Sequence, residues 1–211
     1  DQIGQRCDRD KNMILEELKR RRLYFDGATG TALIDQGLDP TKGCESYNLS
    51  HPETITSLHL AYLQAGADII KTNTFGVNPI KYEEPGRYIE AAMACAKAAV
   101  RQAGRGFIAF DMGPTGKMLA PFGDLPFESA VAAFAENARL AERFGADLVL
   151  IETMNDSYET KAALLAVKEN CRLPVFVTNA YDESGKLLTG TDPVAMIALL
   201  EGLGADAIGM N

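Results

Sequence analysis

The sequence predicts an α/β protein built on a parallel sheet, of the (β/α)8 TIM-barrel class but with only about six βα units. Short apolar segments alternate with helical patterns, which is typical of right-handed βαβ units. Three helical patterns end in the same Gly-Ala-Asp phrase, at residues 66–68, 145–147 and 204–206, where glycine can end a helix in a left-handed turn. The uninterrupted aliphatic run Leu148-Val149-Leu150-Ile151 indicates a strand buried on both faces.

A doubly wound sheet is the competing architecture. No Gly-x-Gly-x-x-Gly phrase opens a helix after the first expected strand, and no acidic residue follows at the spacing of a dinucleotide-binding fold. We therefore favour the barrel, although a closed barrel has about eight strands and the sequence supplies about six.

Residues 1–22 are expected to form an N-terminal extension that ends in a short helix from Met13, and residues 23–211 to form the barrel domain. A helix is expected after Ser50, with Ser50 as its N-cap and Glu53 in its first turn. The other expected helices are 88–103, 127–144, 157–170 and 193–203. The expected strands are 23–25, a segment from 69 to about 73, 107–110, 148–152, 175–178 and 207–210.

Every expected strand ends at a polar side chain: Asp26, Asn73, Asp111, Glu152, Asn179 and Asn211. Because parallel strands deliver their carboxyl ends to one edge, these side chains are expected to share a mouth where a ligand binds. The alternative is that each residue merely caps the loop that follows it. Glu152 ends an apolar run and would lose its solvation without a partner, which is most plausibly a cationic group of a ligand.

Asp26 begins the glycine-rich phrase Asp26-Gly27-Ala28-Thr29-Gly30-Thr31. Glycines allow backbone N–H groups to crowd toward a ligand, and the hydroxyl groups add further donors. A glycine-rich turn is a weak signal alone, but this one follows a strand that also ends in an acid. Asp26 and Glu152 are therefore the strongest candidate site residues.

Charge and composition exclude several classes of function. The formal net charge of −8 argues against a nucleic-acid partner. No apolar run approaches the roughly 20 residues that span a bilayer, and the N-terminus lacks a signal pattern, so we expect no membrane partner and a cytoplasmic location. The cysteines and histidines are Cys7, Cys44, Cys95, Cys171, His51 and His59. Their spacings match no disulfide framework and predict no metal site.

An ordered set of phrases resembles the homocysteine S-methyltransferase family. The phrases are Asp26–Thr31, Tyr47–Pro52, Gly66–Gly76, Asp111–Gly116, Ile151–Thr153 and Leu188–Pro193. Each phrase is weak alone, but their shared order is highly specific and extends from about residue 23 to residue 211. The resemblance is greatest to the homocysteine-binding module of cobalamin-dependent methionine synthases.

The resemblance implies an eight-stranded barrel that makes methionine from homocysteine. It also implies a zinc ion held by three cysteines, of which the first follows a Gly-x-Asn phrase and the other two are adjacent near the eighth strand. Gly209-Met210-Asn211 matches that phrase at the end of the given sequence, so the three cysteines are not among these residues. Zinc bound by thiolates would lower the thiol pKa of homocysteine, and we therefore expect the 211-residue chain alone to be inactive.

The same resemblance implies that Asp26 and Glu152 bind the amino-acid head of homocysteine, that the Gly27 backbone donates to it, and that Asn73 and Asn211 belong to the same site. It implies a methyl donor, methylcobalamin replenished from 5-methyltetrahydrofolate, on separate cobalamin- and folate-binding domains. Betaine or S-methylmethionine are alternative donors within the family.

A hypothesis from a different class is a non-catalytic remnant that only binds amino acids. Under either hypothesis, six strands of an eight-stranded barrel would leave two open sheet edges and an exposed apolar interior. We therefore expect self-association or marginal stability.

Overall fold

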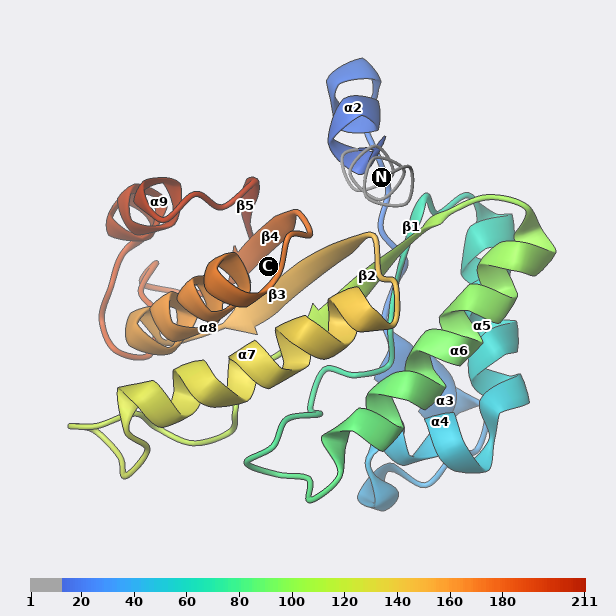
Figure 1. Ribbon diagram of the computed structural model, residues 1–211, viewed down its shortest axis with the longest axis horizontal. Coiled ribbons are helices and arrows are strands. Elements are labelled where there is room, and N and C mark those ends of the chain that lie inside the picture. Colours follow the sequence, from blue (N-terminus) through green and yellow to red (C-terminus); the bar gives the residue numbers. More distant parts are fainter. Residues whose placement is uncertain (1–12) are drawn as a thin grey trace, which may run out of the picture.

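The computed structural model describes residues 13–211, and the expected extension over residues 1–12 lies outside them (Figure 1). Five parallel strands lie side by side in chain order. They are β1 (Ile69–Lys71), β2 (Phe107–Met112), β3 (Leu148–Met154), β4 (Val175–Asn179) and β5 (Ala207–Met210). A doubly wound sheet reverses its strand order at a switch point, and this sheet has no reversal. The predicted α/β barrel with an incomplete set of strands is confirmed.

Helices alternate with the strands and cover the outer face of the sheet (Figure 1). They are α5 (Pro52–Ala65), α6 (Pro85–Ala103), α7 (Phe127–Arg143), α8 (Ser157–Asn170) and α9 (Pro193–Gly202). The short helix α2 (Met13–Arg20) lies apart from them, on the opposite side of the sheet.

The segment before β1 differs from its prediction. The expected strand 23–25 is reduced to a single parallel bridge between Phe25 and Ile69. This segment pairs on one side only, so it forms few ladder hydrogen bonds. The glycine-rich turn passes into an unpredicted helix, α3 (Thr29–Asp35), which is followed by the 3₁₀ turns η1 (Pro40–Lys42) and η2 (Cys44–Ser46).

The expected N-cap of α5 is wrong. Ser50 is the last residue of a one-turn helix, α4 (Tyr47–Ser50), and its hydroxyl donates to the Ser46 carbonyl at 3.2 Å. His51 occupies the N-cap position instead. The capping signal was read correctly as a helix start, but a second helix turn directly before it uses the serine hydroxyl.

The repeated Gly-Ala-Asp phrase joins each helix to the next strand. Gly66, Gly145 and Gly204 have φ angles of 112°, 72° and 78°, which L side chains rarely adopt. Each aspartate then accepts the backbone N–H of the preceding strand segment: Asp68 from Tyr24 at 3.0 Å, Asp147 from Ile108 at 2.7 Å and Asp206 from Val175 at 2.8 Å. The aspartates thus hold the amino ends of neighbouring strands in register, at the edge opposite the carboxyl ends.

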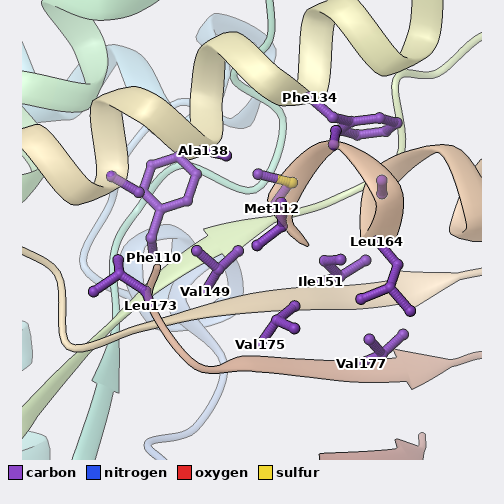
Figure 2. Close-up of a cluster of buried hydrophobic side chains, with 14 of the residues drawn as sticks. Phe110, Met112, Phe134, Ala138, Val149, Ile151, Leu164, Leu173, Val175 and Val177 are labelled. Carbon is purple, nitrogen blue, oxygen red and sulfur yellow. The ribbon is translucent and has the colours of Figure 1, made fainter. Parts of the chain in front are cut away.

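Residues of β3 alternate between two apolar layers. Figure 2 shows Val149 and Ile151 packed with Phe134 and Leu164, between the sheet and helices α7 and α8. Leu148 and Leu150 face the other way, into the barrel interior, together with Phe176 and Ile14 of α2. Both faces of the strand are buried, as the uninterrupted aliphatic run predicted.

The barrel interior is less exposed than expected. Leu150 and Phe176 are 3% and 5% exposed, because the interior side chains pack on one another and on α2. Exposed apolar side chains lie elsewhere, among them Val194 on α9 and Met210 at the end of β5, which are 76% and 66% exposed. The strand β5 is an edge of the sheet. None of the described helices is long and apolar enough to cross a membrane.

Candidate amino-acid-binding mouth

Two cavities lie among the carboxyl ends of the strands. The first, about 250 Å³, is lined in part by Cys44, Glu45, Lys71, Asn73, Asp111 and Glu152. The second, about 220 Å³, is lined in part by Phe25, Asp26, Lys71, Leu150, Glu152 and Asn211. Five of the six expected strand-end residues therefore line a cavity at this edge, and Asp26 and Glu152 face the same one.

Asn179 is the strand-end residue that does not reach this mouth. Its amide nitrogen donates to the Met154 carbonyl at 3.1 Å and to the Thr160 hydroxyl at 3.2 Å. Asn179 instead ties β4 to β3 and α8, which is neither a place in the mouth nor the capping of the following loop.

Glu152 has a cationic partner within the chain. The Lys71 ammonium lies 2.9 Å from its carboxylate, and the two side chains are 16% and 21% exposed. Lys71 ends β1, and β2 lies between β1 and β3 in the sheet. Glu152 thus has the partner that its position at the end of an apolar run predicted, but in this structure that partner is Lys71 and not the ligand group expected as most plausible. The ion pair is only partly buried, and both partners face the cavities.

Asp26 is held with one carboxyl oxygen engaged and the other unsatisfied. The Lys71 backbone N–H donates to Oδ2 at 2.9 Å, whereas Oδ1 has no hydrogen-bond partner within residues 13–211. Burial raises the pKa of Asp26 to about 7, against the hydrogen bond from Lys71 N and the charge of its ammonium, which lower it. A buried carboxyl oxygen without a donor is costly, and Asp26 is one of the residues that line the second cavity.

Asp111 on β2 adds a third acid to the mouth. Its residue is 6% exposed, and its Oδ1 also has no hydrogen-bond partner in the described part of the chain. Burial, followed by the charge of and hydrogen bond to Glu152, raises the pKa of Asp111 well above its usual range. Three carboxyl groups thus surround one ammonium group.

The Lys71 ammonium remains charged despite its burial. Burial lowers the pKa of Lys71, but the hydrogen bond and charge of Glu152, with the charges of Asp111 and Asp26, outweigh it and raise the pKa overall. The mouth therefore contains one positive group among three acids.

Asn73 holds the wall of the first cavity. Its amide nitrogen donates to the Cys44 carbonyl at 2.8 Å and to Asn48 Oδ1 at 3.0 Å, while Asn48 Nδ2 donates to the Asn73 carbonyl at 2.7 Å. Both amide hydrogens of Asn73 are therefore used to fix η2 and α4 over the mouth. Nearby, Glu45 accepts the Gly76 N–H at 2.7 Å.

Gly27 and Asn211 are placed differently from the acids. A Cβ on Gly27 would lie 2.9 Å from the Tyr62 hydroxyl, so a larger residue would displace that ring. The exposed Asn211 amide donates to the Thr153 hydroxyl at 2.7 Å. Asn211 lines the second cavity, whereas Gly27 only adjoins Asp26 in sequence.

The backbone is strained directly after Glu152. Thr153 has φ 59°, and a register irregularity separates Ile151 from Met154. A β-branched residue rarely adopts this conformation, and such strain often accompanies functional sites. The Thr153 N–H donates to the Thr178 hydroxyl at 3.1 Å, which helps to hold this turn.

The described residues do not fit the zinc site that the family resemblance implies. Within residues 13–211, no group of three or more His, Cys, Asp or Glu side chains is arranged to hold a metal ion. Cys44 lines the first cavity, but Cys95 is buried in α6 and Cys171 follows α8. Cys7 lies outside the described residues.

The sequence pattern of the homocysteine S-methyltransferase family matches residues 23–211, and the chain belongs to this family. It is 32% and 31% identical to the methionine synthases of Mycobacterium leprae and Mycobacterium tuberculosis, in alignments that cover 94% of this chain. The chain spans only 18% of the length of those relatives.

Solved structures show the same fold. The metallated form of the homocysteine methyltransferase MmuM from Escherichia coli matches with a TM-score of 0.82 and 23% identity, over 95% of this chain and 77% of that one. Its apo form matches with a TM-score of 0.76 and 24% identity, over 92% of this chain and 73% of that one.

Sequence reasoning missed Lys71, Glu45 and Cys44 as residues of the mouth. Lys71 offered a signal, because a charged residue ends the apolar run Ile69-Ile70 as Glu152 ends its own run. Glu45 and Cys44 belong to a loop without periodicity, so their arrival at the strand ends follows from tertiary contacts alone.

Proposed function

We propose that the mouth binds the amino-acid head of homocysteine, with the ligand ammonium held by Asp26 and Glu152. The observation that carries this proposal is the buried Asp26 Oδ1, which lacks a donor and belongs to a residue that lines the same cavity as Glu152. An ammonium supplies the donor and the charge that this oxygen lacks. Membership of the homocysteine S-methyltransferase family supports the identity of the ligand.

The Gly27 backbone, Asn73 and Asn211 complete the proposed substrate site. Gly27 supplies backbone close to Asp26, and Asn211 lines the second cavity beside Glu152. Asn73 acts by holding η2 and α4, because its amide hydrogens already have partners.

We propose that methyl transfer belongs to a complete family domain that makes methionine from homocysteine. There, bound zinc would make the homocysteine thiol a better nucleophile. By resemblance the methyl donor is methylcobalamin, with 5-methyltetrahydrofolate as its source, on further domains. Betaine and S-methylmethionine are the alternative donors. Since the described residues offer no zinc donor set, we propose that this 211-residue chain binds the amino acid without transferring a methyl group.

The second candidate function is amino-acid binding without any catalytic role. The described lining of the mouth supplies partners for the charged head of an amino acid, which this candidate requires as well. The two candidates differ in what they require of the ligand's sulfur. A homocysteine site should prefer homocysteine over homoserine, whereas a general amino-acid site would bind the two alike.

Calorimetry with L-homocysteine under reducing conditions tests the proposal. Asp26→Asn and Glu152→Gln should each weaken binding by about tenfold or more, because each removes a charge-assisted hydrogen bond. Asp35→Asn, on the exposed end of α3, is the matched control and should bind as the parent does. Unchanged affinity in both mouth variants would overturn the proposal.

A further inference from the structure

Lys71 occupies a position that neutralisation of the acids alone does not explain. Lys71 and Glu152 line both cavities, so their ion pair forms part of the partition between them. Lys71 is also the only cationic side chain among the lining residues of either cavity. A ligand carboxylate entering either space therefore meets one positive side chain.

We propose that Lys71 makes the mouth selective for zwitterionic α-amino acids by exchanging its partner. The Lys71 ammonium separates from Glu152 and binds the ligand carboxylate, while Glu152 and Asp26 bind the ligand ammonium. This inference rests on the proposed function and names the charge pattern that the same site requires. One ion pair is replaced by at least two, and no charged group of the protein or the head of the ligand is left without a partner.

The exchange is chemically balanced because the ligand ammonium and the lysine ammonium are the same kind of group. Glu152 accepts a hydrogen bond from either one. An amine without a carboxylate would displace Lys71 from Glu152 without giving its ammonium, only 16% exposed, a new carboxylate partner. Only Asp111 and Asp26 would remain beside it, and burial raises the pKa of both carboxyl groups. A partly buried ammonium that loses its directly bonded carboxylate is costly, so the site would discriminate against simple amines.

Two observations indicate that the Lys71 ammonium can move while the Lys71 backbone stays in place. The Lys71 N–H is anchored on Asp26 Oδ2 at 2.9 Å, so the start of the side chain cannot shift far. The Lys71 ammonium, in contrast, lies at the end of a flexible four-carbon side chain. Lys71 lines both cavities, so this side chain has space in which to rotate.

The unsatisfied Asp26 Oδ1 is the independent sign of a ligand. Asp26 is 9% exposed, and this oxygen has no partner within residues 13–211, although the Lys71 ammonium is close enough to affect its pKa. The lysine head is committed to Glu152, which leaves Oδ1 for a donor that arrives with the ligand.

The test compares two ligands that differ by the carboxylate alone, L-homocysteine and 3-amino-1-propanethiol, by calorimetry on the 211-residue chain. The parent should bind homocysteine about tenfold or more tightly than the amine, which is the usual effect of one charge-assisted hydrogen bond. In Lys71→Met this preference should fall to about onefold, as homocysteine loses a contact and the amine gains a more acidic site.

Lys71→Arg should retain the preference, and Lys81→Met, which removes an exposed lysine outside both cavities, should leave it unchanged. If Lys71→Met does not fold, Lys71→Gln serves for the same measurement. A preference that persists without the lysine charge would overturn the inference and leave the proposed function intact. Failure of the parent to bind either ligand would overturn both.

Discussion

Replacing Asp26 by asparagine should stabilise the protein above neutral pH while it weakens homocysteine binding. In the parent, the Asp26 carboxyl is buried, and its Oδ1 lacks a donor within residues 13–211. Ionisation of the carboxyl therefore opposes folding. Asparagine keeps an oxygen that can accept the Lys71 N–H but carries no charge to be buried.

The size of the effect follows from the pKa of Asp26. The usual value is 3.8 and the folded value is about 7. Because the folded state keeps a proton that the unfolded chain loses, stability is greatest below the unfolded pKa and falls as pH rises toward 7. The full interval corresponds to about 4 kcal/mol, which is the upper limit of the gain expected for Asp26→Asn.

Urea unfolding of parent and variant between about pH 4 and pH 8 measures this difference. The buried His59, whose pKa burial lowers to about 4, changes the stability of both proteins with the opposite sign and cancels in the comparison. The advantage of Asp26→Asn should grow through this range and level off above pH 7. A pH-independent difference, or a variant less stable at pH 8, would refute the reasoning.

Three further predictions concern the rest of the molecule. His59 is 1% exposed, and neither of its ring nitrogens has a hydrogen-bond partner within residues 13–211. His59→Leu should therefore stabilise the protein by about 1–3 kcal/mol at pH 5, measured by urea unfolding, and a loss of stability would contradict this. Asp147→Ala should lower the free energy of unfolding by about 1.5–3 kcal/mol because the Ile108 N–H loses its charged acceptor, whereas Asp35→Ala on the surface should lower it by less than about 0.5 kcal/mol. Equal losses in the two variants would show that the hydrogen bond from Ile108 to Asp147 contributes nothing to stability. The exposed apolar side chains on α9 and at the end of β5 should cause self-association in sedimentation experiments, and Val194→Glu on α9 should reduce it. A monodisperse monomer with a cooperative melt would count against this prediction.

Features that depend on neighbouring residues in the chain could be predicted from the sequence. Five of the six expected strands, the main helices and the Gly-Ala-Asp junctions each follow from a local pattern, and the incomplete barrel follows from their order. Even there, the sequence could not reveal that the aspartate side chains reach across to the preceding strand, because that contact depends on strand register.

Features that depend on distant residues could not be predicted. Glu152 and Lys71 are 81 residues apart, so the partner of this acid was out of reach of any local pattern. Asn179 and Asn211 both end strands in the same way, yet one is used inside the sheet and the other lines a cavity. The coverage of the interior by Ile14 likewise depends on where α2 packs.

The central claim is that strand ends bring Asp26 and Glu152 together to bind an ammonium group. A crystal structure of the protein with L-homocysteine tests it most directly. The account predicts the amino nitrogen within about 3.2 Å of both carboxylates. An amino-acid head bound elsewhere, or one that turns its carboxylate toward these two acids, would contradict it.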